Sequence, residues 1–485
     1  MNRRSFLTAA AGVAAIAFNP DVLYAATAGI GDWTLGFADV EADIDPRGMR
    51  LVHGKPPAGL AGVLYRNGPA KFHRPGGSVG HWFDGDGMVR RYGLADGKAT
   101  LSARFVDTPK RRADTAANAV ITPGFGTPAG KGGGARSADD VNGANISVMM
   151  AGDDLWALWE SGSPVVMDPT TLASKGFKTL RPDLKGMPFL AHPRFEPDGT
   201  VWNLGVSRNK AVVWNLAADG ALTSATMIDL PRASYLHDFT ATARHLVIVL
   251  QPWIQTRFIT PVVDGYSWQP DLGTQILVID KADLTRRRIY ETDTFSFFHM
   301  GDAWEESDGT IRFDICTEPT PIFGIEGGRA LMRGEKPPAA PRPQLTLIGL
   351  HPDGRTSVEH PGLFAEFPKA DPRFAGQTRR FTAGLSDGPG DNPMFQSVVV
   401  QDWKRERTDR FDFGARFLAE EVVFVPRPGG SAEFDGWLVG TGVNLDAKAT
   451  ELHVFDARKV SAGPITSWRA DVALPISLHG VFKGA

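Results

Sequence analysis

Cysteine, net charge and long apolar runs are all scarce in this 485-residue chain. Cys316 is the only cysteine, so no intrachain disulfide can form and a metal site built from several thiolates is excluded. The formal net charge is −3 and no basic block occurs, which excludes the charge pattern of a nucleic-acid-binding protein. Beyond residue 28 no apolar run is long enough to cross a bilayer as a helix.

The N-terminus has the pattern of an export signal. Arg3 and Arg4 precede a short, alanine-rich apolar run, and Ala26-Thr27-Ala28 offers the small residues of a cleavage site. Adjacent arginines are typical of the twin-arginine (Tat) type, with an ordinary secretory signal as the alternative. We expect cleavage near Ala28, export to the periplasm, and a single domain over residues 29–485 in which residues 29–50 wrap an edge.

Short runs of β-branched and aromatic residues recur along the chain, each followed by a turn rich in Gly or Asp. Examples are GVLYRNG, HLVIVL, TQILVID and TIRFDIC. The 54 Gly and 35 Pro residues are spread evenly, which indicates many turns, and no segment keeps helical periodicity over a dozen residues. This pattern predicts an all-β propeller or barrel, but it does not count the blades.

Two stretches look like binding motifs but lack the rest of the motif. His81, Asp84 and Asp86 in HWFDGDGMV do not have the spacing of a calcium loop, so we interpret them as structural residues of a tight Asp-Gly turn. The Gly-rich segment 123–139 lacks the helix that must follow a phosphate-binding loop, so we expect a flexible excursion.

Four of the 11 histidines share a local setting, in which an apolar or aromatic residue precedes the histidine and a turn or short strand follows. They are His192, His237, His299 and His479. They are too far apart for one local motif, but this suits ligands that different blades contribute to the central channel of a propeller. Imidazole binds iron, zinc, copper and nickel, so the residue type leaves the metal open.

Carboxylates are expected next to such histidines, because metal-bound imidazoles usually donate their second N–H to one. Glu160, Glu366 and Glu421 lie beside aromatic or β-branched residues, where an unpaired carboxylate would be costly to bury. We assign the other histidines to ordinary hydrogen-bonded positions; these are His53, His73, His245, His351, His360 and His453.

Nine short stretches, in order from about residue 45 to 483, form the most specific signal in the chain. They are GVLYRNGP, HWFDGDGM, NGANISV, LWESGSP, AHPRFEPDG, YLHDFTAT, EFPKADPRFAG, EVVFVPRPGG and LHGVF. They resemble the motifs of the carotenoid cleavage oxygenases, a family that includes apocarotenoid-cleaving, stilbene-cleaving and retinal-forming enzymes. The resemblance implies an all-β, seven-bladed β-propeller with a lid of loops over its top face and one Fe(II) per chain on its axis.

The same resemblance assigns residues. The family's four iron-ligand motifs match His192, His237, His299 and His479, and its three supporting glutamates match Glu160, Glu366 and Glu421. Glu420 competes for the last position, but the family's glutamate stands just before an apolar strand that leads to VPRP, which favours Glu421. No general acid or base is assigned beyond the iron site.

The implied reaction is scission of a carbon–carbon double bond with O2 as co-substrate, giving two carbonyl products. Stilbene-cleaving relatives carry a Tyr and a Lys that contact a phenol, and the aligned residues here are Phe105 and Asn142. Without those partners a carotenoid or apocarotenoid is the favoured substrate. Cleavage of a stilbene, iron-dependent isomerisation or hydrolysis, and a non-catalytic binding propeller remain as alternatives.

Residues 251–270 are apolar with little charge and follow the second ligand motif, where family members build the mouth of the substrate tunnel. We expect Trp253 and Phe258 to line the tunnel together with Phe105 and Asn142. The segment is also expected to form an apolar rim that contacts a bilayer surface, with a core strand and lid as the alternative. Nothing in the sequence indicates more than a monomer.

Overall fold

The computed structural model describes residues 32–389 and 392–485. The predicted export signal, residues 1–28, lies outside the described residues. No helix in the described part of the chain is long and apolar enough to cross a membrane.

Antiparallel strands dominate the fold, and five four-stranded sheets follow one another within the described residues. In chain order the sheets are β7 (Ser147–Ala151), β8 (Asp154–Leu158), β9 (Val165–Met167) and β10 (Ser174–Phe177); β11 (Arg194–Phe195), β12 (Val201–Ser207), β13 (Lys210–Leu216) and β14 (Leu222–Asp229); β15 (Thr240–Ala241), β16 (His245–Leu250), β19 (Thr274–Asp280) and β20 (Arg287–Thr292); β21 (Ser296–Glu305), β22 (Ile311–Glu318), β23 (Gln344–Leu350) and β24 (Thr356–Glu359); and β25 (Glu366–Lys369), β26 (Phe381–Ser386), β27 (Ser397–Asp402) and β28 (Arg407–Asp412).

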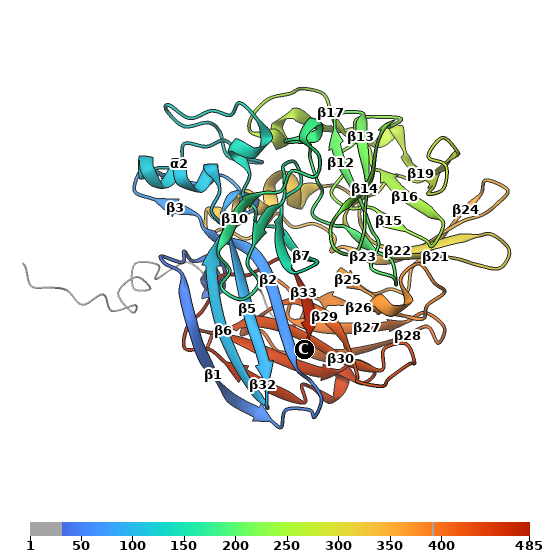
Figure 1. Ribbon diagram of the computed structural model, residues 1–485. Coiled ribbons are helices and arrows are strands. Elements are labelled where there is room, and N and C mark those ends of the chain that lie inside the picture. The colour runs from blue at the N-terminus through green and yellow to red at the C-terminus, as the bar shows by residue number, and fades with distance from the viewer. Residues whose placement is uncertain (1–31, 390–391) are drawn as a thin grey trace, which may run out of the picture.

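A nine-stranded sheet joins the two ends of the described chain. Its order is β29 (Phe417–Pro426), β30 (Gly436–Asn444), β31 (Ala449–Asp456), β32 (Thr466–Arg469), β1 (Ile44–Gly54), β6 (Lys98–Phe105), β5 (Asp86–Ala95), β2 (Gly62–Lys71) and β33 (His479–Gly484). Strand β1 pairs with β32 on one side and with β6 on the other, and β33 pairs with β2. Figure 1 shows the red C-terminal strands beside the blue N-terminal ones, so hydrogen bonding between distant segments closes the ring.

Short elements connect these strands. They are the hairpins β3 (His73–Arg74) with β4 (Gly77–Ser78) and β17 (Trp253–Gln255) with β18 (Tyr266–Trp268); the α-helices α2 (Pro109–Ala117) and α3 (Gly328–Met332); the π-helical turn η7 (Phe323–Gly327); and the 3-10 turns η1 (Asp32–Phe37), η2 (Trp82–Asp84), η3 (Ala138–Val141), η4 (Pro182–Leu184), η5 (Val262–Gly265), η6 (Pro270–Leu272), η8 (Pro372–Phe374) and η9 (Val460–Ala462). Helix α2 begins where the Thr108 hydroxyl accepts a hydrogen bond from the Arg111 N–H, and it ends at Asn118 in the left-handed conformation.

Edge strands of four of the four-stranded sheets, together with both end strands of the nine-stranded sheet, meet at the centre of the ring. Strand β15 contacts β21, β21 contacts β25, β25 contacts β29, β29 contacts β33, and β33 contacts β7. This arrangement confirms the expected all-β propeller, in which inner strands from distant parts of the sequence surround one axis.

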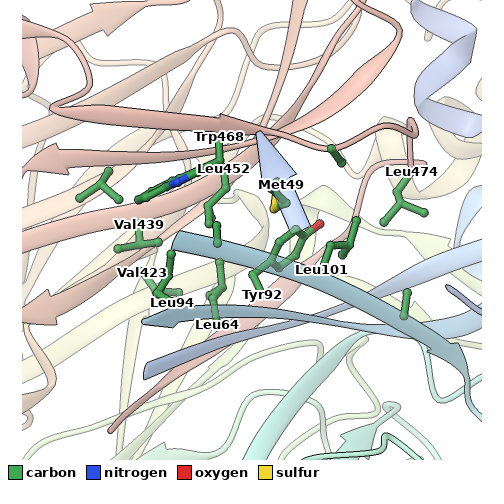
Figure 2. Close-up of a cluster of buried hydrophobic side chains, with 14 of the residues drawn as sticks. Met49, Leu64, Tyr92, Leu94, Leu101, Val423, Val439, Leu452, Trp468 and Leu474 are labelled. Carbon is green, nitrogen blue, oxygen red and sulfur yellow. The ribbon is translucent and has the colours of Figure 1, made fainter. Parts of the chain in front are cut away.

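The largest core cluster lies within the nine-stranded sheet. Figure 2 shows Leu64, Tyr92 and Leu101 of β2, β5 and β6 packed against Val439, Leu452 and Trp468 of β30, β31 and β32. All of these side chains are buried. Because neighbouring sheets cover both faces of a strand in a propeller, β29 is buried along nearly its whole length and shows no simple alternation of buried and exposed residues.

The HWFDGDGMV stretch has a structural role, as predicted. Its contacts also hold part of the Gly-rich segment 123–139, for which the sequence predicts a flexible excursion. The Asp84 carboxylate accepts hydrogen bonds from the N–H groups of Phe125 and Gly126 and from the Thr127 hydroxyl. Asp86 pairs with Lys110 at 2.9 Å. Residues 125–127 are therefore bound to the turn, and the expected flexible excursion is wrong for this part of the segment because a buried carboxylate needs their donors.

Candidate metal centre

Four histidine side chains meet on the axis of the ring. One ring nitrogen of each, from His192, His237, His299 and His479, lies within 4.8 Å of the other three. The Nε2 atoms of His192 and His237 are 3.0 Å apart, those of His237 and His299 3.3 Å, and those of His299 and His479 3.1 Å. The structure thus brings together all four residues that the sequence singled out.

Each histidine comes from the inner strand of a different sheet or from the residues just before it. His192 and His237 precede β11 and β15, His299 lies in β21, and His479 is the first residue of β33. The pairing of β21 with β22 shifts register between Phe297 and Met300, and such a bulge turns a side chain away from the regular alternation.

Arg194 holds three of these segments in place. It follows His192 by two residues, and its guanidinium donates hydrogen bonds to the carbonyl oxygens of Phe239 at 2.5 Å and Gly301 at 2.9 Å. It also donates to the Asp238 carboxylate at 2.6 Å, which in turn accepts from the Met300 N–H at 2.8 Å. The backbones beside His192, His237 and His299 are therefore cross-linked before any metal is considered.

Three glutamates orient three of the imidazoles. The His237 Nδ1 is bonded to Glu160, the His299 Nδ1 lies 2.5 Å from Glu366, and the His479 Nδ1 lies 2.8 Å from Glu421. A carboxylate accepts the Nδ1–H, so the Nε2 lone pair of each ring is left facing the centre. These are the three glutamates that the sequence predicts.

The donor set fits a metal cation. Burial, with the neighbouring imidazoles, lowers the pKa of His192 well below its usual value, and burial lowers the pKa of His299 and of His479 to about 3. Burial also acts to lower the pKa of His237, but the Glu160 carboxylate outweighs it and raises the pKa overall. Several neutral nitrogen lone pairs that converge within hydrogen-bond distance repel one another unless a cation lies between them.

The adjacent glutamates of β29 face opposite surroundings. Glu421 accepts hydrogen bonds from the His479 ring and, at 2.8 Å, from the Gly480 N–H. Glu420 instead lies 3.4 Å from the Arg90 guanidinium and 3.7 Å from that of Arg66. The pairing of β29 with β30 shifts register between Ala419 and Val422, which lets two consecutive carboxylates be buried on different sides.

Two further residues at the centre were not anticipated from the sequence. The Tyr235 hydroxyl donates to Glu160 at 3.0 Å, and burial, followed by the charge of Glu160, raises the pKa of Tyr235 well above its usual value. The Phe367 ring stacks on His299 at 4.7 Å, and its backbone has the strained φ of 57°, from which its N–H reaches Glu366 at 2.8 Å. The available signal was proximity: Tyr235 stands two residues before His237, and Phe367 follows Glu366.

A cavity of about 1190 Å³ adjoins the histidines. Its wall includes His237, His299 and His479, and the rest is mostly aromatic and aliphatic, with Phe83, Phe125, Phe298, Phe323 and Phe367 among the residues. A large apolar cavity that ends at a few convergent polar groups is typical of a site for an apolar small molecule.

The predicted tunnel residues lie in two different environments. Phe258 lines the cavity, but Phe105, Asn142 and Trp253 are not part of its wall. Phe105 is buried in β6 under the Arg111 guanidinium, and the Asn142 side chain is bonded to Ser163 and Ala144. Trp253 is only 1% exposed and packs on Tyr235. The structure therefore leaves these three side chains outside the wall of this cavity, because position in an aligned segment does not decide which way a side chain points.

Known proteins resemble this chain over nearly its whole length. Residues 37–484 match the protein-family model described as retinal pigment epithelial membrane protein. The chain is 29% identical to the apocarotenoid-15,15'-oxygenase of Synechocystis sp., with 93% of this chain and 95% of that protein covered. It is 26% identical to resveratrol cleavage oxygenase 1 of Aspergillus fumigatus, with 91% and 92% covered. The crystal structure of cobalt-substituted Synechocystis apocarotenoid oxygenase matches with a TM-score of 0.84 at 26% identity, covering 94% of this chain and 98% of that one.

The two adjacent glutamates provide a matched test of the metal centre. In Glu421→Gln the His479 ring loses its charged acceptor, so we expect Co(II) affinity to fall by about 10- to 100-fold, measured by competition with a chelator. In Glu420→Gln the buried Arg66 and Arg90 lose their counter-charge, so the midpoint of thermal unfolding should fall while Co(II) affinity stays within about threefold. Equal losses of affinity in the two variants would contradict the assignment of Glu421.

Proposed function

This chain belongs to the carotenoid cleavage oxygenase family, and from that membership we propose that it is a monomeric oxygenase that uses one Fe(II) and O2 to cleave a carbon–carbon double bond into two carbonyl groups. The observation that carries the proposal is the cluster of four histidines with three glutamate partners beside an apolar cavity. Iron bound by the four imidazoles would supply the redox chemistry that activates O2.

The protein's own contribution is orientation and exclusion of water. Phe298 and Phe367 lie beside the histidines in the cavity wall, where flat rings pack against a conjugated substrate and hold one double bond next to the metal. Glu160, Glu366 and Glu421 are each engaged by an imidazole, so they serve to fix the histidines and are not assigned a proton-transfer role.

For the substrate we propose a carotenoid or apocarotenoid, with a stilbene as the alternative. The apocarotenoid oxygenase relative and the volume of the cavity support the first choice. Phe105 and Asn142 do not bear on this choice, because neither side chain lines the cavity. The resveratrol-cleaving relative supports the alternative.

We also propose seven blades and a lid. The nine-stranded sheet then counts as two four-stranded blades, β29 to β32 and β33 with β2, β5 and β6, which β1 links. Added to the five separate sheets, they complete the ring. The lid consists of the connections that line the cavity away from the strands, chiefly parts of residues 123–141 and 336–343.

Oxygen labelling tests the proposed reaction. Protein reconstituted anaerobically with Fe(II) is mixed with 18O2 and with apocarotenals, carotenoids and hydroxystilbenes in turn. We expect two labelled carbonyl fragments from one substrate class and no loss of substrate without O2, as read by mass spectrometry. If iron binds at one per chain and no substrate is lost in an oxygen-dependent way, isomerisation or hydrolysis becomes the better proposal.

We further propose that residues 258–262, within the apolar stretch 251–270, form a rim that contacts a membrane surface. Phe258, Ile259 and Val262 are 74%, 39% and 36% exposed and border the cavity, whereas Trp253 is buried and takes no part. Phe258→Ser combined with Ile259→Ser should lower binding in liposome flotation by several-fold. Met227→Ser, at a 52% exposed site in β14, is the control and should bind like the wild type; unchanged flotation of the double variant would count against the rim.

We propose that residues 1–28 export the protein to the periplasm. The proposal rests on Arg3, Arg4 and the small residues around Ala28. Mass spectrometry of the periplasmic fraction should find a mature N-terminus near residue 29, and replacing both arginines by lysine should leave the protein in the cytoplasm. An intact N-terminus on periplasmic protein would disprove cleavage, and undiminished export of the lysine variant would disprove the twin-arginine route.

A further inference from the structure

The cavity wall contains a carboxyl group that has no part in holding the histidines. Glu318, the last residue of β22, lines the cavity and is 7% exposed. It pairs across the sheet with Ser296, three residues before His299, so it belongs to the same sheet as one of the proposed iron ligands. The wall has three acidic residues in the described part of the chain, and the other two, Glu160 and Glu366, are bonded to imidazoles.

The Glu318 carboxyl lacks a strong partner within the protein. Among the described residues no lysine, arginine or histidine forms an ion pair with it, and its one hydrogen-bond contact is the Ser296 hydroxyl at 3.5 Å. That hydroxyl has a single proton and lies closer to the Gln251 side-chain oxygen, at 2.8 Å. The carboxyl is thus free to bind a molecule that enters the cavity.

A buried carboxyl without a partner is unfavourable for the folded protein alone, so its presence in a binding cavity indicates a ligand. Burial, with the charge of Glu366, raises the pKa of Glu318 to about 8. The neutral acid offers one hydrogen-bond donor and one acceptor, and it therefore suits an alcohol or a carbonyl oxygen.

We propose that Glu318 binds an oxygen-bearing end of the substrate, a hydroxyl or carbonyl group, and thereby selects oxygenated conjugated molecules over hydrocarbon ones. This inference rests on the proposed cleavage function and narrows its substrate class. A fixed contact at Glu318 also sets which double bond lies beside the histidines, so the residue governs the position of cleavage as well as affinity. Glu318 is a specificity residue, with no assigned part in the bond-breaking step.

Binding without turnover tests the contact first. Iron-loaded protein is titrated anaerobically with an apocarotenal, the matching alcohol, and a hydrocarbon polyene of equal length, and tryptophan fluorescence gives each Kd. Glu318→Leu should weaken the two oxygenated ligands about tenfold or more and leave the hydrocarbon within about twofold. Glu318→Gln, which keeps a donor and an acceptor, should recover most of the affinity.

Control variants distinguish a loss of ligand binding at Glu318 from a loss of folding or of iron. Ser296→Ala removes the hydroxyl behind Glu318 but keeps the carboxyl, so it should retain the preference for oxygenated ligands. Iron content and unfolding midpoint should be unchanged or higher in Glu318→Leu, because no strong bond is lost. If that variant does not fold, Glu318→Met replaces it, and failure of both variants to fold would show a structural role and overturn the proposal.

Turnover with O2 then tests the role of Glu318 separately from the proposed double-bond cleavage. We expect Glu318→Leu to raise KM for the oxygenated substrate and to release a mixture of products from neighbouring double bonds, where the wild type releases one pair. Equal affinity losses for all three ligands, or an unchanged product pattern and KM, would overturn the role of Glu318 alone. Selective binding by the wild type with no cleavage of any substrate would overturn the proposed reaction and leave the Glu318 contact standing.

Discussion

The centre of this protein depends on one electrostatic constraint, which is that four imidazoles must turn their lone pairs toward a single point. A ring does so when its other nitrogen carries the proton, and Glu160, Glu366 and Glu421 accept that N–H from three of the rings, those of His237, His299 and His479. Additional hydrogen bonds to these carboxylates, such as the one from the Gly480 N–H to Glu421, offset the free-energy cost of burying them. The same constraint explains the strained backbone of Phe367, whose N–H completes the surroundings of Glu366.

The propeller meets this constraint because its inner strands run side by side around an axis. The four histidines lie in or just before strands of four separate sheets, and Arg194 and Asp238 link the segments that hold three of them. Ring closure by β33 and β2 brings in His479 as the first residue of the closing strand. Strand pairing at the closure and the geometry of the histidine cluster are therefore coupled, and polar groups concentrate at the axis while the cavity beside it remains mainly apolar.

The centre was predictable from the sequence to a greater extent than the cavity. His192, His237, His299 and His479 stand in similar local settings, and their glutamates lie in apolar surroundings that penalise a free carboxylate. By contrast, the sequence predicts that Phe105, Asn142 and Trp253 line the tunnel, but they lie outside the cavity wall, and it predicts no role for Glu318 or Tyr235. A metal-binding site requires particular residue types, whereas many residue types can line an apolar cavity. The residues of the wall are therefore harder to predict from the sequence.

The sequence by itself determined the β-rich character of the fold, the absence of an intrachain disulfide and the identity of the converging histidines and glutamates, because residue chemistry and short-range turn patterns carry that information. Only the tertiary structure decided that β1 links two groups of strands, that Glu421 and Glu420 face different partners, and which side chains reach the cavity. The physical reason is that strand pairing between distant segments and the register shifts within them set the direction of each side chain, and neither is encoded by any local stretch of residues.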